Sequence, residues 1–215
     1  MIRFFKAAVL IIFVLTVYKS NAQSYIGVFG GLNSSRLAGD VPDDAKYKGL
    51  MGANVGAYVD IKLAKIVWLS LQPSYSQEGT KVSYTLSGQA EPVDSIKIRL
   101  NYFSLPLLVK VSSTNGKFYA IGGIETAFLL SHDLSSHGEN QESDLSISDI
   151  NVAAHFGAGI RIPIGLPRLV LELRYTQGLI DLTDEPVDRS YIPRVKTIGF
   201  KFLAGIEIPL SRNKQ

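Results

Sequence analysis

The chain has 215 residues, and its 22 Lys and Arg against 19 Asp and Glu give a formal net charge of +3. It contains no cysteine, which excludes disulfide bonds and thiolate metal sites, and its 3 histidines leave little material for a zinc site. A hydrophobic content of 46% is typical of a folded chain rather than a disordered one.

The N-terminal segment, residues 1–22, is predicted to be a cleavable signal peptide. Arg3 and Lys6 precede an apolar run over residues 7–17, and small residues then place a cleavage site before Gln23. As a helix this run spans roughly 16 Å, short of the ~30 Å hydrocarbon core of a bilayer. An uncleaved N-terminal anchor is the alternative. Export of a single mature domain, residues 23–215, is therefore expected.

Removal of this segment also removes the basic excess of the chain. Without Arg3, Lys6 and Lys19, the Lys and Arg that remain equal the 19 Asp and Glu. The mature sequence contains no Lys/Arg cluster that could follow a phosphate backbone. We therefore expect no nucleic-acid partner.

The mature chain alternates apolar and polar residues with a period of two, which predicts β-strands. In residues 51–62, for example, Met51, Val55 and Ile61 share one face, while the other carries Gly, Asn, Tyr and Asp. Segments of this kind are predicted at residues 25–32, 51–62, 67–77, 99–111, 118–130, 150–162, 169–176 and 198–208.

The connections between these eight segments alternate in length. The long, polar ones are residues 33–50, 78–97, 131–148 and 181–195, and the short ones are residues 62–66, 112–117 and 163–167. An up-and-down barrel of the bacterial outer membrane has short periplasmic turns and longer external loops. The alternation of short and long connections therefore predicts that neighbouring strands are antiparallel and that both chain ends lie on the periplasmic side.

A soluble, lipocalin-like barrel is the competing fold, with its apolar face inside. The predicted strands run to about 11 to 13 residues, whereas a tilted membrane strand needs about 9–11 and a typical globular strand about 5–6. The polar face is rich in Gly, Ser, Asn and Thr, which suits a narrow lumen better than a water-facing surface. We predict an all-β fold, an eight-stranded antiparallel up-and-down transmembrane β-barrel surrounded by outer-membrane lipid.

The predicted inward face carries isolated charges, which need partners in a narrow lumen. They are Asp60, Glu125, His155, Arg161, Glu172, Arg174, Lys201 and Glu207. Eight strands leave room only for side chains, so the favoured interpretation is a structural salt-bridged plug. An ion path or proton relay is the alternative.

Two other groups of residues have a functional and a structural interpretation. His132, Asp133 and His137 could form a divalent-cation site or indicate hydrolase chemistry, but their spacing matches no regular metal motif, and a solvated acidic loop explains them. We expect no catalytic residue, cofactor or metal. The aromatics Tyr25, Trp68, Tyr75, Tyr102, Tyr119 and Tyr175 could stack on a ligand, but girdles at the membrane interface are favoured for those near strand ends, with Tyr58 and Tyr102 as candidates for the lumen.

Several segments resemble the PorT-like outer-membrane β-barrel family of Bacteroidota. They are Gly30–Ser35 (GGLNSS), Leu71–Gly79 (LQPSYSQEG) and Leu100–Leu108 (LNYFSLPLL). The resemblance implies a single-domain barrel in the outer membrane, and its founding member is linked to a secretion and gliding apparatus. The C-terminus departs from many bacterial barrels, because it lacks a terminal aromatic residue.

The sequence therefore predicts a non-enzymatic outer-membrane barrel with a plugged lumen. It would act through its external loops, by adhesion, scaffolding or docking of an envelope protein. The alternatives are a subunit of a secretion or gliding apparatus, by resemblance, and a membrane lipid-modifying enzyme.

Overall fold

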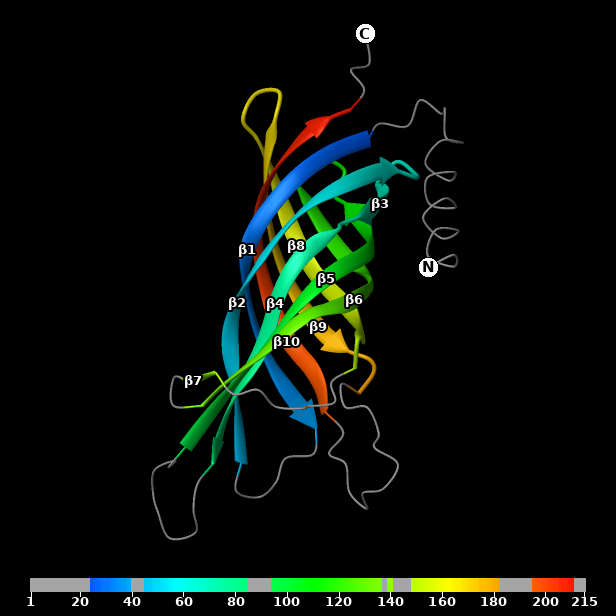
Figure 1. Cartoon of the computed structure of the whole chain (residues 1–215). Coiled ribbons are helices and arrows are strands. Elements are labelled where there is room, and N and C mark those ends of the chain that lie inside the picture. Colours follow the sequence, from blue (N-terminus) through cyan, green and yellow to red (C-terminus); the bar gives the residue numbers. More distant parts are fainter. Residues whose placement is uncertain are drawn as a thin grey trace, which may run out of the picture.

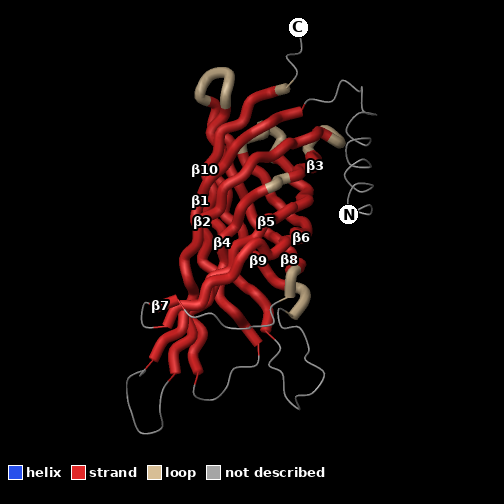
Figure 2. Tube along the Cα trace, in the orientation of Figure 1, coloured by secondary structure: helices blue, strands red, loops and turns tan. Residues whose placement is uncertain are grey.

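The structure, a computed structural model, describes residues 24–39, 45–84, 94–136, 139–140, 148–181 and 195–210. The regular structure of these residues is entirely β-strand (Figure 2). The strands are β1 (Ser24–Gly39), β2 (Ala45–Lys62), β3 (Val67–Leu71), β4 (Ser74–Tyr84), β5 (Asp94–Ser112), β6 (Phe118–Ser136), β7 (Glu139–Asn140), β8 (Ile150–Pro163), β9 (Arg168–Gly178) and β10 (Val195–Pro209). Within the described ranges, no helix has the length and apolarity needed to cross a membrane.

The strands form a closed antiparallel ring (Figure 1). β1 pairs with β2 on one side and with β10 on the other, and the remaining neighbours follow in chain order. β3 and β4 both lie between β2 and β5, while the short β7 pairs only with β6 among the described strands. Counting β3 and β4 as one interrupted strand gives a ring of eight, so the predicted fold is confirmed.

The interruption between β3 and β4 is caused by Pro73, which has no N–H to donate to the ladder. Leu71 pairs with Leu107 and Ser74 with Ser104, so the register on β5 is the same before and after the break. Around it, the Gln72 N–H donates to the Pro106 carbonyl at 3.0 Å. The break therefore leaves the ring closed and keeps the alternation of faces, so Gln72 lies in the lumen with Ser70 and Ser74 and is fully buried.

The two ends of the barrel differ. Short turns at residues 63–66, 113–117 and 164–167 join strands at one end, where the Leu210 N–H also donates to the Ser24 carbonyl at 2.8 Å. We call this the short-turn end and the opposite one the long-loop end. Gly116 (φ 70°) and Gly165 (φ 108°) occupy turn positions that a side chain would strain.

At the long-loop end the strands are longer than predicted. β1 continues to Gly39, β4 to Tyr84 and β6 to Ser136, so the expected loop boundaries at 33–50, 78–97 and 131–148 were wrong. Apolar alternation stops where the predicted strands stop, but backbone pairing does not depend on apolar side chains. Four strands, β2, β4, β5 and β6, project beyond the others as a ribbon (Figure 1). The predicted signal peptide, residues 1–22, lies outside the described residues.

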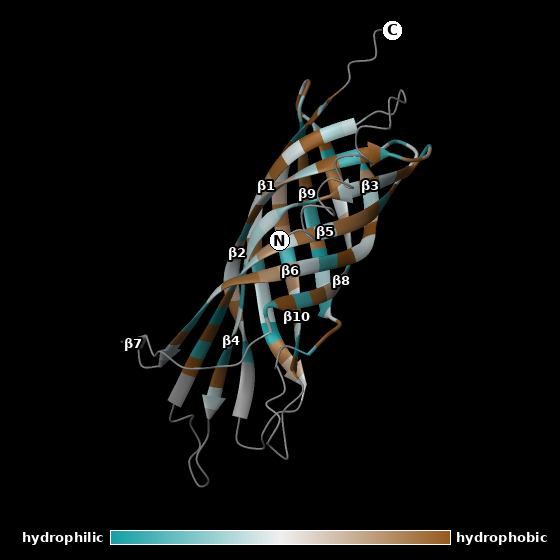
Figure 3. Ribbon diagram, turned by 45° about the vertical axis from the view of Figure 1, so that its right-hand side comes forward, coloured by the Kyte–Doolittle hydropathy of each residue, from teal (hydrophilic) through white to brown (hydrophobic). Residues whose placement is uncertain are grey.

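Hydrophobic and hydrophilic residues alternate along the strands (Figure 3), and successive side chains of a strand point to opposite faces of the barrel wall. Val55, Phe156 and Phe202 are 55%, 58% and 58% exposed on the outside, while Arg174 and Lys201 are each 3% exposed on the inside. This is the orientation of a membrane barrel, and it excludes the soluble alternative, in which these faces would be exchanged.

The outward position of Phe202 allows a test, because the cost in unfolding free energy of placing a charge on the lipid-facing side can be measured. Phe202 lies near the middle of β10, so Phe202→Arg is expected to reduce the free energy of unfolding from lipid vesicles by about 2–4 kcal/mol. Leu166→Arg, in a short turn, is the matched control and should cost only about 0–1 kcal/mol. Urea titrations monitored by tryptophan fluorescence measure both. Equal costs at the two positions would contradict the placement of the lipid belt.

Candidate functional site

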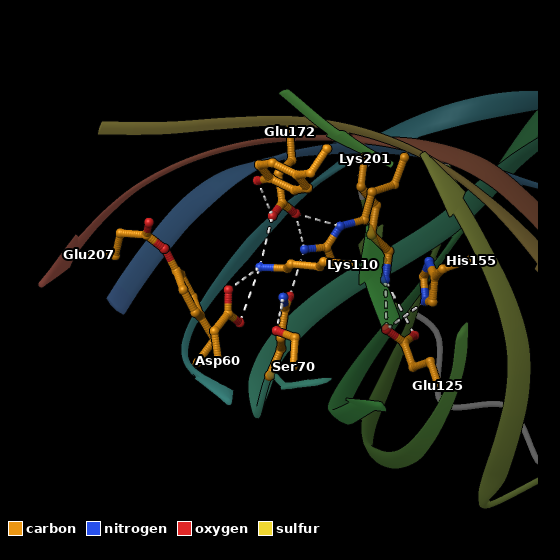
Figure 4. A network of polar contacts seen from close by, with 12 residues as sticks. Asp60, Ser70, Lys110, Glu125, His155, Glu172, Lys201 and Glu207 are labelled. Carbon is orange, nitrogen blue, oxygen red and sulfur yellow. Dashed lines mark hydrogen bonds and ion pairs between the residues drawn. The ribbon is translucent and has the colours of Figure 1, made fainter. Parts of the chain in front are cut away.

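The lumen holds the candidate site. The eight charged residues predicted to face inward are each no more than 5% exposed: Asp60, Glu125, His155, Arg161, Glu172, Arg174, Lys201 and Glu207. Their contacts divide them into two groups, one around Lys110 and one around Lys201 (Figure 4).

Lys110, from β5, is central to the first group. Its Nζ lies 3.0 Å from Asp60 Oδ2 on β2 and 3.3 Å from Glu172 Oε1 on β9. The same ammonium is 4.6 Å from the centroid of the Tyr58 ring, within the range of a cation–π contact. One buried cation therefore connects three strands of the ring.

Arg174 extends this group across the barrel. Its Nε donates to Glu172 Oε2 at 2.8 Å, and its Nη2 donates to Gln72 Oε1 at 2.6 Å. The Tyr119 hydroxyl donates to the other carboxylate oxygen of Glu172 at 2.6 Å. β9 and the β3–β4 break are opposite each other in the ring, so the contact with Gln72 spans the lumen.

Arg161 makes a second contact between opposite strands. From β8 it reaches Asp60 on β2, with Nη2 3.4 Å from Oδ2. Its Nη1 donates to Ser112 Oγ at 2.9 Å, and its Nε lies 3.3 Å from Glu207 Oε1. Glu207 is also paired with Arg168 at 2.5 Å, near the short-turn end.

The second group is centred on Lys201. Its Nζ lies 3.1 Å from Glu125 Oε2 and 3.5 Å from Glu78 Oε1. His155 Nε2 is 3.1 Å from the same Glu125 oxygen, and His155 Nδ1 is 3.1 Å from the hydroxyl of Thr176. These residues come from five different strands, which the group ties together at mid-barrel.

The sequence and the fold now agree on a class of protein. Residues 21–184 match the family described as "Outer membrane protein beta-barrel domain". The chain belongs to this family. It is an outer-membrane β-barrel protein, with a charged lumen and an apolar outer surface.

Three solved structures are similar to this outer-membrane barrel. Ail of Yersinia pestis has 15% identity and a TM-score of 0.44 over 88% of this chain and 100% of that chain. Neisserial surface protein A has 10% identity and a TM-score of 0.44 over 88% and 99%. OprG of Pseudomonas aeruginosa has 13% identity and a TM-score of 0.45 over 89% and 97%. A search of curated proteins found no match.

Charge in the described part of the lumen is balanced. The carboxylates are Asp60, Glu78, Glu125, Glu172 and Glu207, and the cations that contact them are Lys110, Arg161, Arg168, Arg174 and Lys201. Burying an ion without a partner in a medium of low dielectric constant costs several kcal/mol of free energy, which explains why each buried charge has a partner of opposite sign.

Glycines make room for the tyrosines of this network. A Cβ added to Gly27 would overlap the ring of Tyr58, and one added to Gly159 would overlap the ring of Tyr119. The free space beside Glu172 in the first group has room for no more than about one water molecule. In the part of the chain that is described, no group of three or more His, Asp or Glu could hold a metal ion. The site is thus packed and cross-linked by charge.

Sequence reasoning missed four members of the network, among them Arg168, which directly precedes the predicted strand 169–176. Lys110 shares its face of β5 with Tyr102 and Leu108, so parity along this strand could have found it. Glu78 was assigned to a loop because the predicted third strand ended at residue 77, whereas β4 continues to Tyr84. Gln72 shares its inward face with Ser70 and Ser74, so the period-two pattern of the predicted strand 67–77 could have found it.

The interfacial girdle predicted from aromatics was partly wrong. Tyr25, Trp68 and Tyr119 are buried inside the barrel near the short-turn end. There the rings of Tyr25 and Trp68 are 5.4 Å apart, and the Arg161 guanidinium lies 4.2 Å from the Tyr119 centroid. Buried guanidinium groups attract aromatic faces, so these rings pack the lumen. Tyr75, by contrast, faces outward.

The residues suggested for metal or hydrolase chemistry lie elsewhere. His132 and Asp133 are exposed on the extension of β6, opposite Leu100 and Arg99. His137 lies outside the described residues. Their roles stay predictions.

Lys110 provides the sharpest test of the network. Lys110→Met keeps the length of the side chain but leaves Asp60 and Glu172 without their shared cation, and is expected to cost about 3–5 kcal/mol of unfolding free energy. Lys117→Met, at an exposed turn position, should change it by no more than about 0.5 kcal/mol. Reversible urea unfolding in vesicles measures both. A Lys110→Met barrel as stable as the wild type would show that the network is not a stabilising element.

Proposed function

We propose that this protein is a non-enzymatic outer-membrane barrel with a closed lumen, and that it acts through its long-loop end by adhesion, scaffolding or partner docking. The contacts of Arg161 with Asp60 and of Arg174 with Gln72 carry this proposal, because each joins strands on opposite sides of the ring. A lumen crossed by its own side chains has no room for a hydrated solute.

The asymmetry of the two ends supports a role for the long loops. The short turns span residues 63–66, 113–117 and 164–167 and present little surface. At the other end the β4–β5 pair continues to Tyr84 and Asp94, well past the apolar belt. In bacterial outer-membrane barrels the longer loops face outward. Partner docking would involve residues 33–50, 78–97, 131–148 and 181–195.

A PorT-like role in a secretion or gliding apparatus is the alternative. Two of the segments that carry this resemblance meet in the structure, since the Gln72 N–H donates to the Pro106 carbonyl at the strand break. This contact gives the two segments a structural role in the barrel wall. A barrel wall of this kind is compatible with many functions. It therefore supports membership of a barrel subgroup more than participation in a particular machine.

A lipid-modifying activity has less support. His132 and Asp133 lie on adjacent positions of β6, and successive residues of a strand point in different directions unless a bulge intervenes. We expect His132→Ala combined with Asp133→Ala to leave lipid turnover by purified protein at background. Turnover by the wild type that this variant abolishes would favour the enzyme.

Conductance tests the closed lumen. Purified protein in a planar lipid bilayer is expected to give no stepwise current above the baseline, while an open porin in the same bilayer is the positive control. Current steps whose ion selectivity changes in Lys110→Met would assign conduction to this lumen and overturn the proposal.

Crosslinking in native membranes separates docking from the alternatives. A photoreactive residue at position 135, on the β6 extension, should trap an envelope protein, whereas one at position 115, in a short turn, should not. Capture of secretion or motility components would favour the apparatus subunit. Capture only from position 115 would contradict a role for the long-loop end.

A further inference from the structure

Three lysines lie on neighbouring turns at the short-turn end of the barrel. Lys62 is the last residue of β2, Lys65 lies in the turn between β2 and β3, and Lys117 lies in the turn between β5 and β6. The two turns adjoin, because the Ser112 N–H donates to the Ile66 carbonyl at 2.8 Å. Lys65 and Lys117 are exposed and Lys62 is half-buried. We call these three lysines the basic rim.

The exposed charge at this end of the barrel is positive only. The described residues near it include two carboxylates, Asp60 and Glu207, and both are buried inside the barrel and paired with buried cations. The two segments that adjoin this end in the sequence, residues 1–23 and 211–215, contain no Asp or Glu. The remaining acidic residues belong to the lumen or to strands and connections at the long-loop end. The basic rim therefore has no acidic neighbour that could neutralise it.

Hydrogen bonds hold both turns in fixed conformations. In the first turn, the Val67 carbonyl accepts from the Leu63 N–H at 2.9 Å. In the second, the Asn115 side chain accepts from the Ser113 hydroxyl at 2.7 Å and from the Lys117 N–H at 3.0 Å. A ligand of the basic rim therefore has to order only lysine side chains and not a loop, which lowers the entropic cost of binding.

The position of Lys62 shows which surroundings the basic rim faces. Lys62 pairs with Trp68 in the strand register, and its ammonium lies 5.4 Å from the centroid of the Trp68 ring. Trp68 is buried inside the barrel, so Lys62 lies at the mouth of the lumen. Lipid surrounds a barrel but does not cover its mouth. A ligand of Lys62 therefore comes from the periplasm, which the short turns of an outer-membrane barrel face.

The small size of this end limits the kind of ligand that fits it. Its turns, residues 63–66, 113–117 and 164–167, contain four or five residues each. A standard protein–protein interface uses about 20–30 residues of each partner, so a folded protein finds too little surface here. A single exposed ion pair is weak, so a small molecule with one carboxylate is not held either. A polymer that repeats its carboxylates can contact several lysines at once, and multivalency then strengthens the binding.

We propose that the basic rim binds peptidoglycan, the cell-wall polymer of the periplasm, through the free carboxylates of its peptide stems. Lysine acts as a flexible point charge, so Lys62, Lys65 and Lys117 suit a polymer whose carboxylates vary in position. The contact holds the barrel against the wall and leaves the long-loop end free for a partner outside the cell. It is independent of what that end binds and of whether the lumen is closed.

The test measures co-sedimentation of the whole barrel, in nanodiscs of neutral phosphatidylcholine, with purified peptidoglycan sacculi. The rim variant combines Lys62→Gln, Lys65→Gln and Lys117→Gln. The control variant removes the same charge at the long-loop end by combining Lys48→Gln, Lys81→Gln and Lys97→Gln, three lysines that the strand register places side by side. Heat-modifiable migration on a gel verifies that each variant is folded. Sacculi whose carboxylates have been converted to neutral amides, and vesicles containing phosphatidylglycerol, serve as further probes.

We expect the wild type and the control variant to bind sacculi alike, and the rim variant to bind them on the order of 10-fold more weakly. Added salt should weaken binding by the wild type, and amidated sacculi should bind the wild type as weakly as intact sacculi bind the rim variant. Equal affinity of the wild type and the rim variant would overturn the proposal. Binding of phosphatidylglycerol vesicles as strong as that of sacculi would also overturn it, because the rim would then recognise any anionic surface.

Discussion

Inside a closed eight-stranded barrel, an inward charge finds its partner across the lumen, on another strand, because water is largely excluded from that space. Lys110 shows the consequence most clearly, since its ammonium is shared by Asp60 on β2 and Glu172 on β9. Arg161 and Arg174 then reach residues on the opposite side of the ring. Such contacts fix the distance between strands that share no backbone hydrogen bonds. The lumen is thereby both filled and held in shape, which leaves the two ends and the outer wall as surfaces for function.

The outer wall obeys a different constraint, imposed by lipid. Apolar residues such as Phe156 and Phe202 cover the outside of the wall. Toward the long-loop end, polar residues begin at the level of Asn101, which accepts a hydrogen bond from the Tyr75 hydroxyl. The same alternation of side chains creates both faces, so a strand that buries a charge inward presents an apolar residue to lipid on either side of it. This transition from apolar to polar residues toward the long-loop end gives the barrel a defined position in the membrane.

The sequence predicted most of this architecture, because a period of two and alternating loop lengths are properties of neighbouring residues. Once the strands are located, the alternation of side chains along each strand determines that Val55 and Phe202 point outward and that Arg174 points inward. Features that depend on pairing between distant strands could not be predicted. The inward direction of Tyr25, Trp68 and Tyr119 depends on which face each strand end keeps. The contact of Arg174 with Gln72 depends on which strands lie opposite each other in the ring. Glu78 was missed for a simpler reason, because the strand was ended too early.

The alternation of faces on β10 tests the account most directly. Because the chain has no cysteine, single cysteines can carry spin labels at Phe200, Phe202, Leu203, Ala204 and Ile206 in otherwise unchanged protein in vesicles. Labels at the four outward positions should collide readily with oxygen dissolved in lipid, while the label at Leu203, which is buried inside, should be reached poorly by oxygen and by a water-soluble nickel reagent. A Leu203 label open to the nickel reagent, or labels at Phe202 and Ala204 shielded from oxygen, would contradict a filled lumen surrounded by lipid.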